Sequence, residues 1–245
     1  LSSILYCFGH MYSGQTVFLE KNNQKMEVLT DVDMQKIADQ LSCPTGEMGI
    51  ALGERMNDSN IEMTLQTLNN LSFDDNDKIL ELGHGNGGHL QSLISRANNL
   101  QYVGLEISLT MANQARLINA NLVHEKKASF ELYDGAFIPF QEYSFQKVIT
   151  VNTIYFWKTP KILLLEIYRV LHSNGTFAIA FANKYCMEKL SYVRFGFRLW
   201  EISEVIGLAK AIGFQHLESI DLEDYVESEN GDLVDRKYIV LKFSK

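Results

Sequence analysis

Residues 81–88 read Glu-Leu-Gly-His-Gly-Asn-Gly-Gly, which places four glycines within six positions. The stretch follows an apolar run over 78–82 that reads as a buried strand, and it opens a segment over 88–97 that reads as a helix. Glycine tolerates the positive φ angles of a tight turn and lets a ligand approach the backbone closely. Because ligands of open α/β sheets bind at the carboxyl ends of the strands, the stretch predicts a ligand-binding turn between a strand and a helix.

Two glycine patterns overlap in this turn. Gly83, Gly85 and Gly88 satisfy the G-x-G-x-x-G pattern of dinucleotide-binding sites. Glu81 together with Gly83, Gly85 and Gly87 satisfies an acid-x-G-x-G-x-G pattern. Both patterns suit a cofactor that contains a nucleoside, and the glycines alone do not choose between the two.

Apolar runs that read as strands alternate with segments that read as helices along the next part of the chain. The predicted strands cover 78–82, 101–105, 129–132, 146–151 and 176–181. The predicted helices between them cover 88–97, 109–120 with Ser108 as N-cap, and 160–171 with Pro160 in the first turn. This alternation predicts an α/β fold of the doubly wound kind, in which helices cover both faces of a mostly parallel sheet.

The last part of the chain departs from this alternation. A predicted helix over 202–211 ends before Gly213, and two predicted strands over 214–220 and 237–243 follow. Asn230-Gly231 between these strands is a hairpin-turn signal, because both residues accept the positive φ angles of a type I′ turn. An antiparallel hairpin is therefore expected to close the otherwise parallel sheet.

Composition limits the classes of function. The chain has 245 residues, a hydrophobic fraction of 46% and a formal net charge of −8, which suits one α/β domain with a short cap and argues against nucleic-acid binding. The cysteines, Cys7, Cys43 and Cys186, lie far apart without C-x-x-C spacing, so neither a zinc site nor a disulfide framework is indicated and a reducing cytoplasm is expected. No apolar run reaches the roughly 18 residues of a membrane span. The oligomeric state is left open.

Acidic residues follow the next two predicted strands after the glycine turn. Glu106 ends the strand over 101–105, where a carboxylate can accept hydrogen bonds from two ribose hydroxyls of either cofactor type. Asp134 follows the strand over 129–132, where it can accept from an adenine amino group; a turn-forming role beside Gly135 is the alternative. Two acids at successive strand ends favour a site for an adenine nucleoside.

Taken in order, these stretches resemble the class I S-adenosylmethionine-dependent methyltransferases. The resemblance covers 74–245. Within this range it is also carried by the stretches 139–140, 167–171 and 211–214. It implies a Rossmann-like, seven-stranded, mostly parallel sheet with an antiparallel C-terminal strand. It implies S-adenosyl-L-methionine as cofactor, with S-adenosyl-L-homocysteine as product. No cluster of carboxylates and histidines in the sequence indicates a required metal.

The resemblance also implies roles for individual residues. The glycine turn would lie along the methionine part of the cofactor, Glu106 would hold the ribose, and Asn152 would face the transferable methyl. The complete set of expected cofactor-binding residues is Glu81, Gly83, His84, Gly85, Gly87, Glu106, Ile107, Asp134, Gly135, Ala136, Asn152 and Thr153. Tyr155 and Trp157 follow the fourth strand and are candidates to bind the acceptor, although core packing fits these aromatics equally well.

The expected reaction is in-line transfer of a methyl group to a small-molecule acceptor. The subfamily is similar to the methyltransferases of ubiquinone biosynthesis, with departures at Gln146 and over 171–175. An NAD-dependent oxidoreductase and a non-catalytic S-adenosylmethionine-binding protein are the alternatives. Loop packing or solvent exposure is the expected role of His84 and His89, so no catalytic base is assigned.

The expected organisation has three parts. Residues 1–10 resemble a cloning-derived tail, with a short natural strand as the alternative; 11–73 form an N-terminal helical cap; and 74–245 form the catalytic domain with a cap insert at 183–200. Within the cap, helices are expected over 33–40, with Asp33 as N-cap, and over 61–71. The insert mixes cations with aromatic residues. It is expected either to bind an anionic substrate or a membrane surface, or to form a capping helix whose cations are solvated.

Overall fold

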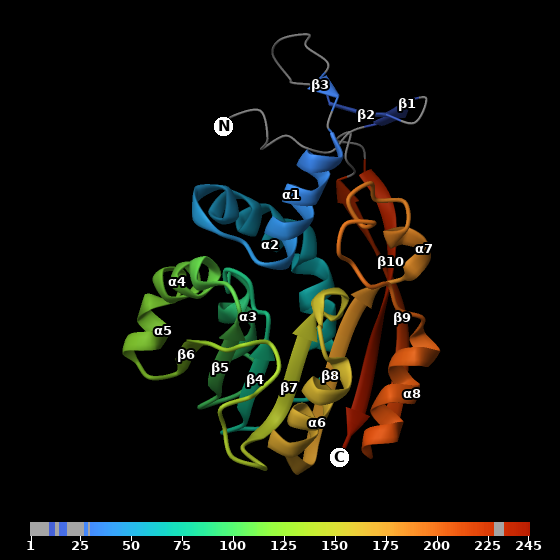
Figure 1. The fold of residues 1–245 in the computed structure, drawn as a ribbon. Coiled ribbons are helices and arrows are strands. Elements are labelled where there is room, and N and C mark those ends of the chain that lie inside the picture. The colour runs from blue at the N-terminus through green and yellow to red at the C-terminus, as the bar shows by residue number, and fades with distance from the viewer. Residues whose placement is uncertain (1–9, 13–14, 19–26, 29, 228–232) are drawn as a thin grey trace.

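A twisted sheet of seven strands forms the centre of the protein, with helices on both of its faces (Figure 1). The computed structural model describes residues 10–12, 15–18, 27–28, 30–227 and 233–245. The strand order in the sheet is β6-β5-β4-β7-β8-β10-β9. The strands are β4 (Lys78–Leu82), β5 (Gln101–Glu106), β6 (Ala128–Leu132), β7 (Phe145–Val151), β8 (Leu171–Ala182), β9 (Gln215–Glu227) and β10 (Leu233–Ser244).

The strand directions confirm the predicted fold class. Strands β4, β5, β6, β7 and β8 pair in parallel, whereas β10 pairs antiparallel with both β8 and β9. The predicted hairpin turn at Asn230-Gly231 lies outside the described residues, but Glu227 pairs with Leu233 on either side of it. The sheet is therefore doubly wound and mostly parallel, with a reversed last strand.

The central strands are apolar on both faces, because each face is covered. Ile79 of β4 packs in one cluster with helix residues such as Leu90 and Leu93, whereas Leu80 and Leu82 pack in the other cluster with Leu163 and its neighbours. Such continuous apolar runs are typical of parallel strands between two helical layers. This is why the strands could be predicted from short runs of sequence.

The helices are α1 (Asp31–Ser42), α2 (Gly46–Asn69), α3 (Leu90–Ile94), α4 (Leu109–Ile118), α5 (Ala120–His124), α6 (Pro160–Val170), α7 (Lys184–Met187) and α8 (Ile202–Ile212), with a 3₁₀ turn η2 at Ile154–Phe156. Ser108 caps α4 as predicted, since its Oγ accepts from the Met111 N–H at 3.1 Å. Pro160 lies in the first turn of α6, also as predicted. The helix predicted over 88–97 is shorter, and the one predicted over 109–120 breaks at Asn119 into α4 and α5.

The predicted cap over 11–73 is helical only from Asp31 onward. Ahead of it, β1 (His10–Tyr12), β2 (Gln15–Phe18) and β3 (Glu27–Val28) form a small antiparallel sheet. Residues 1–9 of the predicted tail lie outside the described residues. Thr30 caps α1 through a capping box with Asp33, so the predicted N-cap at Asp33 is wrong by one turn.

Helix α2 begins well before the start predicted at Ile61. Its first half contains three glycines, which disfavour a helix when they are judged from sequence alone. In the structure two of these glycines allow close packing: a Cβ added at Gly49 would lie 2.7 Å from the Pro44 carbonyl carbon, and one added at Gly53 would lie 2.5 Å from Met111 Sδ of α4. Figure 1 shows α2 at the end of the sheet where the arrowheads of β7 and β8 lie, so this helix covers the edge at which the site residues gather.

Candidate functional site

The glycine turn between β4 and α3 has the backbone that its sequence predicts. Gly83, Gly85 and Gly87 have φ angles of 71°, 58° and 67°, in the left-handed region that favours glycine. A Cβ added at Gly83 would lie 2.4 Å from Thr153 Cγ2, whereas one added at Gly85 would have no atom within 4 Å. Gly83 is therefore required by packing against the protein itself, and Gly85 leaves an open approach to the backbone.

Glu106 stands at the tip of β5, directly beside this open part of the turn. Its Oε1 accepts from the backbone N–H groups of Ile107 at 2.8 Å and Ser108 at 3.0 Å, and its Oε2 accepts from the Gly85 N–H at 3.3 Å. Burial raises the pKa of the Glu106 carboxyl above its ordinary value, and the three N–H donors oppose that rise. Oε2, with one long hydrogen bond, is the oxygen best placed to accept from a bound ligand.

The loop after β6 lies next to the tip of β5. Asp134 Oδ1 accepts from the N–H groups of Ala136 at 2.8 Å and Phe137 at 2.7 Å, and these bonds lower the pKa of the exposed Asp134 carboxyl. Gly135 has a φ of 82°, and a Cβ added there would lie 3.4 Å from Ile107 Cγ2. The structure thus brings the predicted ribose and adenine residues to neighbouring positions, with one Asp134 oxygen used to form the loop.

Asn152 and Thr153 follow the tip of β7 on the other side of the turn. Asn152 has a φ of 55°, a conformation that asparagine tolerates better than most residues. The Thr153 methyl group faces Gly83, and its Oγ1 accepts from Trp157 Nε1 at 3.1 Å. Since β6, β5, β4 and β7 are neighbours in the sheet, the predicted cofactor-binding residues gather along one edge.

Glu81 differs from the other predicted cofactor-binding residues, because its side chain lies buried among protein groups. Its Oε2 accepts from the Tyr102 hydroxyl at 2.8 Å and contacts His89 Nε2 at 2.8 Å. Burial opposes charge on both groups, yet the attraction between them holds the pKa of His89 above and the pKa of Glu81 below their ordinary values. The described contacts of this carboxylate thus tie the β4 strand to the helix after the turn.

His84 also turns its side chain into the protein. The ring packs edge-on against Phe130 at 5.0 Å between centroids, and a Cβ at Gly104 would lie 2.5 Å from His84 Cδ2. Neither ring nitrogen has a hydrogen-bond partner among the described residues. Burial lowers the pKa of His84 to about 4, so the imidazole is neutral in the folded protein at neutral pH.

This burial predicts a loss of stability in acid. An unfolded histidine gains a proton near pH 6.5 while the folded His84 resists it down to about pH 4, so stability falls as the pH drops through this window. We expect His84→Leu to reduce the loss of unfolding free energy between pH 7 and pH 5 by about 2 kcal/mol. Urea unfolding of both proteins at the two pH values measures the difference; equal losses would show that His84 titrates normally.

Tyr155 and Trp157, the predicted acceptor-binding residues, lie beside Asn152 but are largely buried. The Tyr155 hydroxyl accepts from the Ala182 N–H at 2.7 Å and donates toward Asn152 Oδ1 at 3.1 Å. Burial raises the pKa of Tyr155 well above its ordinary value, so the hydroxyl keeps its proton. These side chains pack against the protein just after the end of β7. Their contact with an acceptor stays a prediction.

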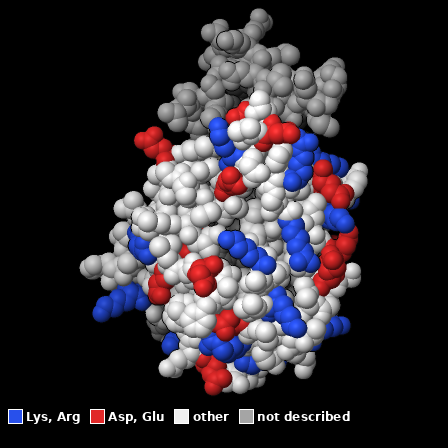
Figure 2. All heavy atoms as spheres, in the orientation of Figure 1, with Lys and Arg blue, Asp and Glu red and all other residues white. Residues whose placement is uncertain are grey.

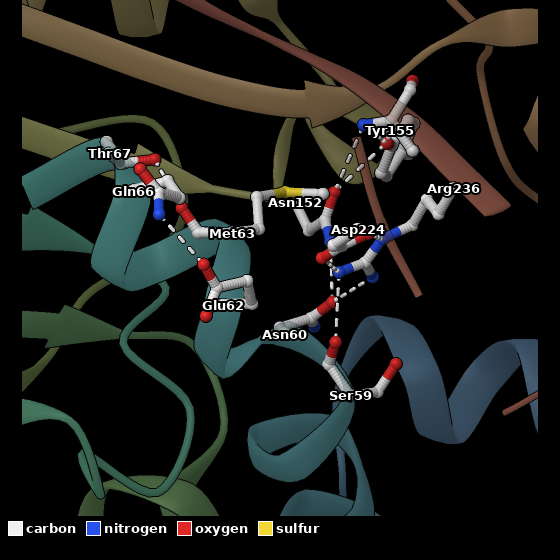
Figure 3. A network of polar contacts seen from close by, with 11 residues as sticks. Ser59, Asn60, Glu62, Met63, Gln66, Thr67, Asn152, Tyr155, Asp224 and Arg236 are labelled. Carbon is white, nitrogen blue, oxygen red and sulfur yellow. Dashed lines mark hydrogen bonds and ion pairs between the residues drawn. The ribbon is translucent and has the colours of Figure 1, made fainter. Parts of the chain in front are cut away.

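A group of polar residues joins Asn152 to the C-terminal hairpin, and the sequence did not point to it. Asn152 Nδ2 donates to Asn60 Oδ1, which also accepts from Arg236, and Arg236 pairs with Asp224 (Figure 3). Arg236 and Asp224 lie on β10 and β9, far along the chain from the glycine turn. No local pattern marks them, because the contact with α2 exists only once the chain has folded.

The insert at 183–200 packs its aromatic residues inward. Trp200 Nε1 donates to the Ile154 carbonyl at 3.2 Å, and Phe197 packs against Phe156 at 4.6 Å between ring centroids. Two of its cations have acidic partners, with Lys184 3.0 Å from Glu201 and Arg194 2.5 Å from Asp31, and the other two, Lys189 and Arg198, lie over the rings of Tyr185 and Trp200. Figure 2 shows Lys and Arg interspersed with Asp and Glu on this face of the molecule. These contacts favour the capping interpretation of the insert.

Two kinds of site are absent from the part of the chain that the structure describes. Within it, no cluster of three or more His, Cys, Asp and Glu side chains could hold a metal ion. Among the same residues, none of the helices combines the length and the apolar character that crossing a bilayer requires.

Comparisons of sequence identify relatives of the chain. The family described as "Methyltransferase domain" matches residues 80–179. The "Uncharacterized methyltransferase YdaC" of Bacillus subtilis (strain 168) is 30% identical over 114 residues, which cover 46% of this chain and 60% of the relative. The chain therefore spans less than two thirds of that relative.

Comparisons of structure agree on the fold. A chain from the Haloferax volcanii complex between the Trm112 methyltransferase activator and a methyltransferase matches with a TM-score of 0.66 at 18% identity, over 86% of this chain and 96% of that one. Geranyl diphosphate methyltransferase, solved with GPP and sinefungin, matches with a TM-score of 0.64 at 12% identity, over 75% and 78% of the two chains.

The matched segment 80–179 contains the glycine turn, both strand-tip acids and the tip of β7. The sheet around it has the seven strands and the reversed last strand that the resemblance implied. The chain is therefore similar to methyltransferases in the sequence of this segment and in the fold of the sheet around it.

Proposed function

We propose that this protein is a methyltransferase that uses S-adenosyl-L-methionine to methylate a small-molecule acceptor. The observation that carries the proposal is the open backbone at Gly85 beside Glu106 Oε2. A nucleoside-bearing ligand needs both a close approach to the backbone and a carboxylate for its ribose hydroxyls. Both features lie at the carboxyl edge of the parallel strands, where ligands of such sheets bind.

The residues present fit this cofactor. Glu106 Oε2 would accept from the ribose, Asp134 would accept from the adenine amino group, and the turn 83–87 would lie along the methionine part. Because Asp134 Oδ1 already accepts from two loop N–H groups, Oδ2 is the oxygen expected to receive the amino group. Ile107, between the two acids, would contact the nucleoside.

The cofactor would supply a methyl group already activated on a sulfonium, so the protein's task is to position and shield the reactants. Correct orientation of two reactants is worth roughly 7–11 kcal/mol of the barrier. Helix α2 covers the turn, since a Cβ added at Gly88 would lie 2.7 Å from Asn57 Oδ1. This cover would exclude water from the reacting atoms. No catalytic base is assigned, and the ubiquinone-type acceptor and a cytoplasmic location stay predictions from the sequence.

Titration calorimetry with two ligands tests the proposal. S-adenosylhomocysteine is expected to bind with a micromolar dissociation constant, and NADH is expected not to bind. Binding of NADH without S-adenosylhomocysteine would instead favour the oxidoreductase alternative. Formation of S-adenosylhomocysteine from S-adenosylmethionine is then measured across a panel of small metabolites; binding without turnover on any of them would favour the non-catalytic alternative.

A further inference from the structure

Two charged side chains near the end of α6 hold the loop that follows β6. Glu166 Oε2 accepts from the Ile138 N–H at 3.0 Å. Arg169 Nη2 donates to the Ile138 carbonyl at 2.8 Å, and its Nη1 donates to the Phe140 carbonyl at 2.6 Å. Helix α6 therefore holds both polar backbone groups of Ile138 and the carbonyl two residues further on. We call Glu166 and Arg169 the loop clamp.

The two members of the loop clamp also hold each other. Arg169 Nε lies 2.8 Å from Glu166 Oε1 and Nη2 lies 2.7 Å from Oε2, which makes the contact bidentate. The hydrogen bonds from Arg169 lower the pKa of the Glu166 carboxyl, so it stays ionised at neutral pH. Because the two residues are three positions apart on one helix, α6 presents them to the loop as a preformed pair.

The clamped backbone continues directly from the turn that Asp134 forms. Asp134 Oδ1 accepts from the N–H groups of Ala136 and Phe137, and Glu166 accepts from the next N–H in the chain, that of Ile138. Three successive N–H groups thus have carboxylate acceptors, two from the loop itself and one from α6. The Ile138 side chain is fully buried, whereas Asp134 is exposed. Ile138 is therefore the anchor next to an exposed carboxylate.

The loop is held on both sides of Asp134. Before it, the Tyr133 N–H donates to the Glu106 carbonyl at the tip of β5, at 3.1 Å. After it, the loop clamp holds the backbone of Ile138. Ordering a free loop costs conformational entropy, and a loop that is already ordered binds a ligand without that cost. The loop clamp is thus expected to lower the cost of presenting the Asp134 carboxylate to a ligand.

We infer that Glu166 and Arg169 are positioning residues for adenine recognition, because they hold the loop from which Asp134 Oδ2 would meet the adenine amino group. The inference rests on the proposed function, which assigns the amino group to Asp134. Neither member of the loop clamp is assigned a contact with the cofactor. Loss of the clamp is therefore expected to reduce discrimination between purine bases more than it reduces binding as a whole.

The affinities of S-adenosylhomocysteine and S-inosylhomocysteine, measured by calorimetry, test this inference. The second ligand has a carbonyl oxygen where adenine has its amino group, so it presents an acceptor to Asp134 in place of a donor. Wild type is expected to bind S-adenosylhomocysteine at least tenfold more tightly than S-inosylhomocysteine. Asp134→Ala is the reference variant, and its two affinities are expected to lie within twofold of each other.

Two variants alter the loop clamp. Glu166→Leu with Arg169→Met removes it without a change in net charge, and both new residues are good helix formers. We expect the ratio of the two affinities to fall at least threefold below that of wild type. Arg169→Lys keeps the charge, but one ammonium cannot reproduce the planar fork that reaches Glu166 and two carbonyls. A smaller fall in the same direction is expected, and this variant stands in if the double variant does not fold.

Lys147→Gln with Asp77→Asn is the matched control. Lys147 Nζ lies 3.6 Å from Asp77 Oδ2, both side chains are 8% exposed, and the same oxygen accepts from the Asp74 N–H at 3.0 Å. This pair likewise holds a turn through its backbone, but its partners lie on β7 and before β4, not in the loop after β6. The ratio of the two affinities is expected to stay within twofold of wild type. Thermal unfolding of each variant shows whether the protein measured is folded.

The outcomes separate the inference from the proposed function. A wild-type chain that binds neither ligand contradicts both. Equal affinities in wild type, or an Asp134→Ala variant that keeps the preference for adenine, overturn the inference and leave cofactor binding in place. A wild-type ratio in the folded clamp variants overturns the inference alone. A fall of equal size in the Lys147/Asp77 control also overturns it, because the effect would then come from a general loss of stability.

Discussion

Replacing Glu106 by alanine is expected to weaken the binding of S-adenosylhomocysteine at least tenfold. The carboxylate is 6% exposed and ends β5 beside the open backbone of Gly85. A hydrogen bond to a charged acceptor in such a place is worth about 1.5–3 kcal/mol, and two ribose hydroxyls would lose their acceptor together. A tenfold change in affinity corresponds to about 1.4 kcal/mol, so tenfold is the smallest loss that we expect. Titration calorimetry at neutral pH measures it.

Two further variants show whether the loss comes from the ribose contact. Glu106→Gln keeps an oxygen for the N–H groups of Ile107 and Ser108 but loses the negative charge, so an intermediate loss is expected. Glu131→Ala removes an exposed carboxylate from the neighbouring strand β6 and is expected to leave the affinity unchanged. Equal affinities for wild type and Glu106→Ala would refute the ribose role.

Replacing His89 by leucine is expected to lower the free energy of unfolding by about 3–5 kcal/mol. The change leaves the buried Glu81 carboxylate with the Tyr102 hydroxyl as its remaining hydrogen-bond donor among the described side chains and without a compensating charge. Urea unfolding followed by circular dichroism measures the loss. Adding Glu81→Gln to the variant removes the buried charge, and the double variant is expected to recover part of the stability.

The pH dependence of this effect has a defined sign. His89 has a raised pKa, so its contribution is complete below the ordinary value of 6.5 and is lost as the pH rises through the raised pKa. Glu81 has a lowered pKa, so its contribution is present above 4.5 and is lost as the pH falls through the lowered pKa. The destabilisation by His89→Leu should be greatest between pH 4.5 and 6.5. A loss that is small and independent of pH would contradict the charged pair.

Short sequence patterns correctly predicted those boundaries of helices and strands that depend on a few neighbouring residues. The strand β4 matches its predicted bounds, Ser108 caps α4, and Pro160 begins α6, because each depends on a short apolar run or on one residue's hydrogen bonding. The start of α2 was missed, since Gly53 lowers helix propensity in isolation and favours the helix only through its contact with α4. Tertiary packing decided that boundary.

The same limit applies to the site. The glycine spacing predicted the backbone of the turn, with positive φ at Gly83, Gly85 and Gly87. It could not predict where side chains point, and both Glu81 and His84 turn into the protein, away from solvent. Arg236 could not be found from sequence, because its partners are on α2 and β9 and its spacing to them carries no motif.

A crystal structure with S-adenosylhomocysteine bound tests the central claim most directly. The account predicts both ribose hydroxyls within about 3 Å of the Glu106 carboxylate, the methionine part along the Gly83–Gly87 backbone, and the sulfur facing Asn152. A ligand bound elsewhere on the sheet, or a ribose turned away from Glu106, would contradict it.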